Sequence, residues 1–145
     1  MTEDERIARA AIADTLAICT QSGDARKADS YAACFAEDGV LDLGEGDKII
    51  GREALRAWMK TPSAFPQPEG AEPGFVSHHL TTCRITLTSE FTATARTYWL
   101  VTTAIGLDHN GYYDDFFVKD GEHWLLTYRR PRMLWKSPQS LIHKR

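Results

Sequence analysis

Apolar residues follow two different periods along this chain, and the change between them divides it into a helical part and a strand-rich part. In the first part they recur every three to four positions, which is typical of one face of a helix. A helix is predicted to begin after Thr2, because Glu5 follows three residues later in a capping-box pattern, and to end at Gly23. Its predicted apolar face consists of Ile7, Ala10, Ala11, Leu16 and Ile18.

Two further helices and a short hairpin complete the first part. A second helix is predicted over residues 25–35 and is followed by the turn signal Glu37-Asp38-Gly39. Short strands are predicted over residues 40–43 and 48–51, with a hairpin-type turn between them. A third helix is predicted over residues 52–59.

The second part of the chain follows a proline- and glycine-rich segment, residues 61–74, which is predicted to be a long loop and a candidate lid. Strands are predicted over residues 76–88, 92–105, 111–119 and 123–130, with turns at Ser89-Glu90, Asp108 to Gly111, and Asp120-Gly121. Helices followed by an antiparallel meander indicate an α+β fold, a cone-shaped curved antiparallel sheet wrapped around the N-terminal helices.

Composition narrows the class of protein. A chain of 145 residues predicts a single domain, residues 1–145, with room for a core and a small-molecule pocket. The net charge of −3 and the lack of a basic stripe argue against a nucleic-acid partner, and no apolar run is long enough to cross a membrane. The acidic start lacks the features of a signal peptide, and three cysteines without C-x-x-C spacing argue against disulfides and zinc. A cytoplasmic protein is therefore expected.

The candidate chemistry centres on Asp24 and a pair of histidines. Asp24 lies in a polar break between two predicted helices, where it could cap the second helix or pair with an imidazole. His78 and His79 open a predicted strand, and strict alternation places His79 on the apolar face with Ile85. Placing His78 inward requires a bulge or a strand that is buried on both faces. Adjacent strand residues point to opposite faces, so joint metal binding by the two histidines is not expected.

Further candidates lie on the strands and on the third helix. Tyr113 could donate a hydrogen bond to a substrate oxygen, and Asp115 could pair with Arg129 on the next strand, in a structural or a substrate-binding role. The remaining candidate pocket residues are Trp58, Phe75, His79, Thr97, Trp99 and Phe117. For aromatic residues in such folds, a plain core role is the more common alternative. His109, His123 and His143 are predicted to face solvent in turns or in the tail.

Several motifs together resemble the SnoaL-like family of the nuclear transport factor 2-like superfamily, which includes scytalone dehydratase, ketosteroid isomerase and hexachlorocyclohexane dehydrochlorinase. The matching segments are Arg9 to Leu16, Gly23-Asp24, Phe35 to Val40, Gly51 to Leu55, His78 to Ile85 and Gly111 to Phe117. The resemblance implies a cystatin-like α+β barrel in which His78 is the general base, Asp24 orients it and Tyr113 assists. Thr82 replaces an asparagine found in many members, and Thr97 falls near the second active-site histidine of scytalone dehydratase, which argues against scytalone as the substrate.

The resemblance implies a lyase or isomerase, dehydratase-like and without a cofactor, that acts on a small, apolar, cyclic substrate. A non-catalytic binding or assembly subunit, like the small subunit of ring-hydroxylating dioxygenases, and a polyketide cyclase-like protein remain alternatives. The expected partners are the substrate and further copies of the chain, as a homodimer or a homotrimer.

Overall fold

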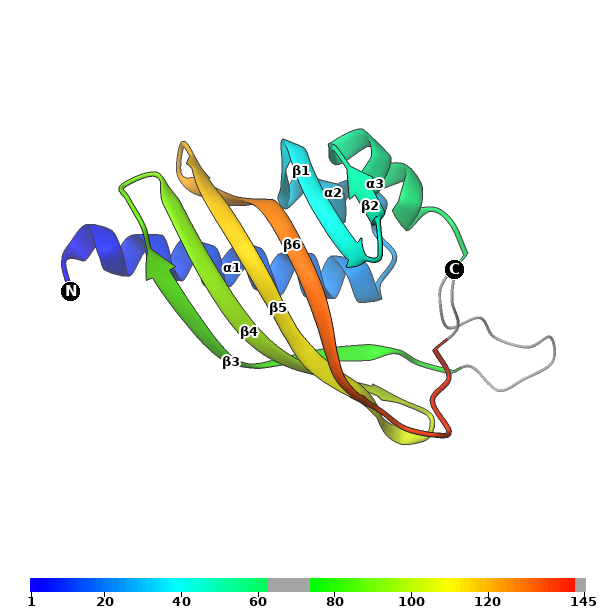
Figure 1. Cartoon of the computed structure of the whole chain (residues 1–145). Helices are drawn as coiled ribbons and strands as arrows, with labels where there is room; N and C mark the ends of the chain where they lie inside the picture. Colours follow the sequence, from blue (N-terminus) through cyan, green and yellow to red (C-terminus); the bar gives the residue numbers. More distant parts are fainter. Residues whose placement is uncertain (63–73, 143–145) are drawn as a thin grey trace.

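The computed structural model describes residues 1–62 and 74–142, and its helices precede most of its sheet (Figure 1). The helices are α1 (Glu3–Asp24), α2 (Ala28–Ala33) and α3 (Arg52–Met59). The strands are β1 (Phe35–Gly44), β2 (Asp47–Ile50), β3 (Ser77–Leu87), β4 (Thr92–Thr103), β5 (Gly106–Asp120) and β6 (His123–Lys136). The predicted loop and lid, residues 61–74, lie almost entirely outside the described residues.

The strands form one curved, unclosed sheet in the order β2-β1-β6-β5-β4-β3. Neighbouring strands are antiparallel, except that β1 and β6 run parallel. In Figure 1, α1 crosses behind the sheet, so the view looks onto the opposite surface of the strands. The face covered by α1 is called the inner face below, and the opposite one the outer face. The fold is therefore α+β, as the change of apolar period predicts.

The first helix begins where its capping box predicts. The hydroxyl of Thr2 accepts a hydrogen bond from the N–H of Glu5 at 3.2 Å, and the Glu5 carboxylate accepts one from the N–H of Thr2 at 2.7 Å. The predicted apolar face was largely wrong, because Ile7 and Ile18 are 58% and 46% exposed. The buried stripe runs through Ala8, Ile12, Thr15, Leu16 and Cys19. It includes a polar residue because the Thr15 hydroxyl donates to a backbone carbonyl of β6.

The core lies between α1, the two short helices and the inner face of the sheet. Its buried members outside α1 include Tyr31, Phe35, Leu41, Leu55, Met59, Phe117, Trp124 and Leu126. No helix in the described part of the chain is both long and apolar enough to span a membrane.

The second helix is shorter and β1 longer than predicted. Phe35 was expected to end the helix, but it is fully buried and opens β1 opposite Leu126. The next pair in the register is Val40 with Tyr128, so β1 uses more residues than β6 over this interval and bulges there. Burial of the Phe35 ring takes precedence over the local turn signal at residues 37–39. The turn predicted at residues 44–47 is confirmed as the hairpin between β1 and β2.

The turn between β4 and β5 lies elsewhere than predicted. It occupies Ala104 and Ile105, with Gly106 at a φ of 93°, whereas Asn110 and Gly111 lie within β5. Gly111 is needed there for space rather than for a turn. A Cβ at this position would collide with the carbonyl oxygen of Arg132 and lie 2.7 Å from Cζ2 of the Trp99 indole. The hairpin at Asp120-Gly121 is confirmed, with Gly121 at a φ of 62°.

Replacement of Gly111 by alanine is expected to lower the free energy of unfolding by about 3 kcal/mol, because a backbone carbonyl and a packed indole must both move. Urea unfolding followed by tryptophan fluorescence measures this change. The matched control is Gly23→Ala. Gly23 lies in α1, and its added Cβ would meet Tyr31 only at ordinary contact distance, 3.5 Å. A Gly111→Ala variant as stable as the control would contradict the close approach of Trp99 and Arg132 to Gly111.

Candidate active site

The end of α1 and the beginning of β3 are joined by Asp24 and His78. Nδ1 of the His78 ring lies 2.6 Å from Oδ1 of Asp24, and the backbone N–H of His78 donates to Oδ2 at 2.9 Å. Both carboxylate oxygens therefore hold one residue. The two side chains are 29% and 22% exposed, so the imidazole remains within reach of a bound molecule.

The contact with Asp24 fixes which nitrogen of His78 can act as a base. An ionised carboxylate only accepts hydrogen bonds, so Nδ1 carries the hydrogen and Nε2 carries the lone pair. The alternative role for Asp24, capping of α2, does not describe this arrangement. The N-cap of α2 is Lys27, without a side-chain cap bond. The arrangement is that of an imidazole whose ring and backbone are both held by one carboxylate.

A bulge in β3 determines which of the paired histidines faces inward. His78 is opposite Val101 and Leu80 is opposite Trp99, but the next partners are Cys83 and Thr97. Three residues of β3 therefore match two of β4, and this extra residue reverses the alternation. His78 shares the inner face with the apolar residues beyond the bulge.

His79 does not belong to this site, contrary to its assignment as a pocket residue. It is exposed, and its Nε2 lies 3.1 Å from the hydroxyl of Thr102. Its partner in the register is Leu100, so it projects from the face opposite to that of His78. The alternation argument failed because it continued the pattern of Ile85 across the bulge.

Trp99 lies at the centre of a group of rings on the inner face. Its ring centroid is 6.4 Å from that of His78 and 5.7 Å from that of Tyr113. The indole extends over Gly111 of β5, where the missing side chain leaves room for it. Trp99 is only 6% exposed, and its Nε1 has no hydrogen-bond partner within the described residues. Trp99 thus connects the imidazole of His78 to the side chains of β5.

Tyr113 remains protonated at neutral pH. Burial raises the pKa of its hydroxyl, and Asp24 is among the nearby groups whose charge raises it further, against the opposing effect of Arg129. The guanidinium carbon of Arg129 lies 3.9 Å from the centre of its ring, which is a cation–π contact. Tyr113 can therefore donate, but not accept, a proton when a substrate oxygen approaches.

Asp115 and Arg129 form a buried, bidentate ion pair beneath Tyr113. Nε and Nη2 of Arg129 donate to the two carboxylate oxygens at 2.8 and 2.9 Å, and both side chains are almost inaccessible. Burial raises the pKa of Asp115, whereas the guanidinium lowers it, and the bidentate contact keeps both groups charged. Nη1 of Arg129 also lies 3.6 Å from Sγ of Cys19 on α1. The guanidinium of Arg129, fixed by Asp115, packs against the ring of Tyr113.

The other predicted pocket residues are distributed over the core and the surface. Thr97 is fully buried and donates to Sγ of Cys83, and Phe117 is 2% exposed within the core. Trp58 is partly buried on α3, 6.4 Å from the ring of Tyr31. Phe75 is 55% exposed and precedes β3. The structure therefore brings together Asp24, His78, Trp99, Tyr113, Asp115 and Arg129, and separates His79 from them.

A second histidine–carboxylate pair lies on the inner face and was missed in the sequence. His109 was predicted to face solvent in a turn, but it lies within β5 and is 3% exposed. Its Nδ1 is 2.7 Å from Oδ1 of Asp108, which is fully buried. The prediction was wrong because the Asn-Gly turn signal placed residue 109 outside the sheet. The adjacent residues Asp108 and His109, next to a predicted strand, were the sequence signal that could have indicated a second histidine–carboxylate pair.

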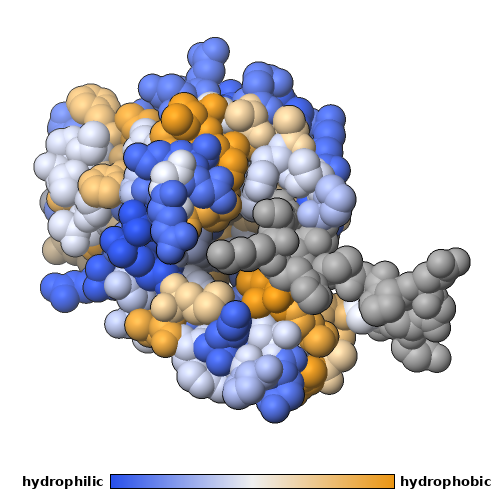
Figure 2. All heavy atoms as spheres, turned by 45° about the vertical axis from the view of Figure 1, so that its right-hand side comes forward, coloured by the Kyte–Doolittle hydropathy of each residue, from blue (hydrophilic) through white to orange (hydrophobic). Residues whose placement is uncertain are grey.

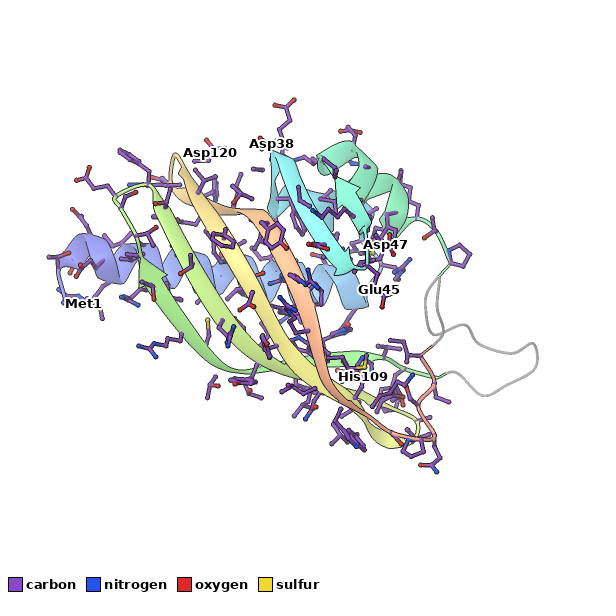
Figure 3. The ribbon with its side chains drawn as sticks, viewed as in Figure 1. Met1, Asp38, Glu45, Asp47, His109 and Asp120 are labelled. Carbon is purple, nitrogen blue, oxygen red and sulfur yellow. The ribbon has the colours of Figure 1, made fainter. Side chains whose placement is uncertain are left out.

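Figures 2 and 3 show where this group lies. Figure 2 views the side on which α1 ends and β3 begins, and apolar residues gather in a recess between the upper part of the molecule and its lower lobe. In Figure 3, Asp120 marks the upper end of β5, and His109 lies on its lower part, below the end of α1.

A shallow hollow of about 540 Å³ lies on the outer face of the sheet, away from this group. Its lining includes Arg84, Arg96, Asp114, Phe116, Tyr128 and Arg132.

A curved, unclosed sheet with N-terminal helices on its inner face defines a class of small α+β proteins. The model of the SnoaL-like domain family matches residues 4–130, and the chain belongs to this family. No curated protein matches the sequence.

Solved structures share the fold. A candidate scytalone dehydratase from Novosphingobium aromaticivorans is 22% identical, with a TM-score of 0.82 over 100% of this chain and 94% of that one. A hexachlorocyclohexane dehydrochlorinase, LinA type 3 from Novosphingobium barchaimii, is 18% identical, with a TM-score of 0.77 over 98% and 97%. A Mycobacterium tuberculosis protein of unknown function is 27% identical, with a TM-score of 0.73 over 90% and 74%.

Loss of the buried carboxylate beside Arg129 is expected to be costly. Asp115→Ala leaves the guanidinium buried without a counter-charge and should lower the free energy of unfolding by about 3–5 kcal/mol. The neighbouring Asp114→Ala is the control, since Asp114 pairs with Arg96 on the outer face, where the two side chains keep 30% and 51% of their surface exposed, and it should cost less than about 1 kcal/mol. Urea unfolding of both variants measures the difference. Equal losses would show that the Asp115–Arg129 pair does not anchor the inner face.

Proposed function

We propose that this chain is a single-domain, cofactor-independent lyase or isomerase, dehydratase-like, that acts on a small, largely apolar, cyclic substrate. The observation that carries this proposal is the hold of Asp24 on both the ring and the backbone of His78. Because this contact engages Nδ1, the other ring nitrogen, Nε2, is left as the base on the inner face of the sheet. Such a group removes a proton efficiently when its pKa is near the working pH, which an imidazole reaches with little adjustment.

In the proposed reaction, Nε2 of His78 removes a proton from a substrate carbon next to an electron-withdrawing group. Asp24 stabilises the imidazolium that forms and keeps the ring in place. The electron pair of the broken C–H bond becomes a double bond, and a group on the neighbouring carbon leaves with its own electron pair. In an isomerisation, the imidazolium instead returns the proton to another carbon.

Tyr113 is proposed to stabilise the negative charge that develops on a substrate oxygen. Its hydroxyl stays protonated because burial raises its pKa, so it can donate a hydrogen bond at neutral pH. The Asp115–Arg129 pair fixes the ring of Tyr113 through the cation–π contact. The indole of Trp99 is proposed as the apolar wall between Tyr113 and His78.

The names of similar structures support an elimination reaction. One is described as a candidate scytalone dehydratase and another as a hexachlorocyclohexane dehydrochlorinase. By these names, the first eliminates water and the second eliminates hydrogen chloride. These names apply to those proteins, and they guide the choice of test substrates for this one.

The first test is turnover of cyclic β-hydroxy ketones and of hexachlorocyclohexane by Asp24→Ala and His78→Ala variants. Each substitution is expected to lower kcat by a factor of about 10²–10⁴, because general base catalysis is lost. The melting temperature should remain near that of the unaltered protein, since both side chains are partly exposed. His79→Ala is the matched control and should keep full activity, because His79 projects from the other face.

Two outcomes would count against the enzyme proposal. One is full activity on a turned-over substrate after loss of either Asp24 or His78. The other is a large fall in the melting temperature of both variants without a specific loss of turnover, which would assign the pair a structural role.

The outer face favours a second proposal, that the protein assembles with further copies of itself as a homodimer or homotrimer. Tyr98 and Phe116 are 43% and 49% exposed there, and each contacts another aromatic ring, Tyr112 and Tyr128 respectively. Arginines surround these rings and line the hollow on this face. Exposed aromatic groups of this kind mark surfaces that associate.

Phe116→Glu is expected to convert the oligomer into a monomer, because it places a charge among the aromatic rings of the outer face. Light scattering after size-exclusion chromatography measures the mass. Ile7→Glu on the exposed side of α1 is the control and should leave the mass unchanged. A monomeric unaltered protein would contradict this second proposal, whereas co-purification with a larger catalytic chain would favour the assembly-subunit alternative.

A further inference from the structure

A row of charged side chains crosses the outer face of the sheet, which is the face seen in Figure 1. Each member is opposite the next in the strand register, except between β1 and β6, where an ion pair of 3.4 Å joins them. From β2 to β3 the members are Lys48, Asp42, Arg130, Asp114, Arg96 and Arg84. The charges alternate in sign from β2 to β4. The alternation fails only at the last step, where Arg84 lies opposite Arg96.

The two arginines of this last step differ in what they contact. Nε and Nη2 of Arg96 donate to the two carboxylate oxygens of Asp114 at 2.8 and 3.2 Å, and its guanidinium carbon lies 4.3 Å from the centre of the Tyr112 ring. Arg84 is exposed and makes no hydrogen bond, ion pair or ring contact with residues 1–62 or 74–142. Like charges directly opposite one another on neighbouring strands repel. An anion is therefore missing from the row beside Arg84.

Both arginines line the hollow of about 540 Å³ on the outer face, and its lining carries an excess of positive charge. Asp114 already serves Arg96, and Arg132 reaches it only at 4.0 Å. The carboxylate of Asp115, which also lines the hollow, is neutralised from the inner face by Arg129. The arginines in the lining are Arg84, Arg96, Arg130 and Arg132.

The chemistry of this lining suits an oxyanion. A guanidinium is always charged, and its planar set of N–H donors matches the oxygens of phosphate and carboxylate groups. The volume of the hollow lies in the range of small-molecule sites. The ring of Phe116 is 49% exposed and lines the same hollow, so an organic group attached to the anion could pack there. A group with two negative charges would offset both arginines at once.

We propose that the outer face has a binding site for a doubly charged oxyanion of the phosphate class, and that Arg84 and Arg96 are its principal ligands. Arg96 is held in place by Asp114 and Tyr112, whereas Arg84 is free to turn toward the anion. The site lies on the opposite face of the sheet from His78, so it does not depend on the proposed reaction. Its occupancy completes the alternation of charge across the sheet.

Titration with inorganic phosphate at about pH 8, where the ion carries two charges, tests the proposal. Ionic strength is kept constant with sodium chloride, so that screening is the same throughout. Isothermal titration calorimetry is expected to give a dissociation constant of about 1 mM or lower, as two charge-assisted contacts would provide. Phosphate should also raise the melting temperature above its value in chloride, because it binds the folded chain.

Three variants identify the residues responsible. Arg84→Gln is expected to weaken phosphate binding about tenfold or more, because one charged ligand is lost. Its melting temperature without phosphate should not fall, since the repulsion by Arg96 is removed. Asp114→Asn should instead strengthen binding, because a competing carboxylate is removed from Arg96. Arg6→Gln on α1 is the matched control, since it removes the same charge from a distant exposed pair and should leave the affinity unchanged.

Phenyl phosphate, measured in the same way, shows where the phosphoryl group comes from. Affinity at least about threefold above that of inorganic phosphate supports a site for a phosphorylated aromatic compound that uses Phe116, and equal affinity supports a site for the free ion.

The proposal would be overturned by any of three results. One is that neither anion binds the unaltered protein more than chloride does. Another is that Arg84→Gln binds phosphate as tightly as the unaltered protein. The third is that Arg6→Gln weakens binding as much as Arg84→Gln, which would assign the effect to the net charge of the chain.

Discussion

The contact between Asp24 and His78 joins two segments that are 54 residues apart in the chain, and the orientation of the imidazole on the inner face depends on it. One oxygen of Asp24 orients the imidazole, while the other fixes the backbone at the point where β3 begins. The contact therefore links the first residues of β3 to the end of α1 and directs the side chain of His78, while the ladder with β4 positions the rest of the strand. A bulge in β3 then allows one strand to present His78 and, further along, apolar core residues on the same face.

The inner face places charged groups in the interior, and each of them has a partner that compensates for its burial. Arg129 and Asp115 neutralise each other through a bidentate contact, and Asp108 accepts hydrogen bonds from both side chains and backbone. Burying such groups in place of hydrocarbon is costly for stability, so these partners are needed to keep the charges in the interior. Pairs that remain in contact with solvent, such as Arg96 with Asp114, contribute little to stability.

The order of elements was predictable because it depends on local patterns. The change from a helical to an alternating period separates α1 to α3 from the long strands, and the capping box locates the start of α1. Errors arose wherever a long-range contact competes with a local signal. Gly111 resembles a turn residue in the sequence, yet the indole of Trp99 and a carbonyl of β6 require it to be a glycine. Because the turn lies nearer to β4 than predicted, His109 lies within β5 and is buried, instead of facing solvent.

The position of His78 illustrates a different limit of the sequence. Period-two alternation cannot detect an inserted residue in a strand, so it selected His79, and only the resemblance of the segment His78 to Ile85 to the family motif pointed to His78. The same consideration explains why the fold does not determine the substrate. Structures similar to this one are described as acting on quite different molecules, although their strands superimpose. Function in such folds depends on the side chains that the scaffold presents. In this chain the inner face brings His78 and Trp99 together with Tyr113, which lies above the ion pair of Asp115 and Arg129.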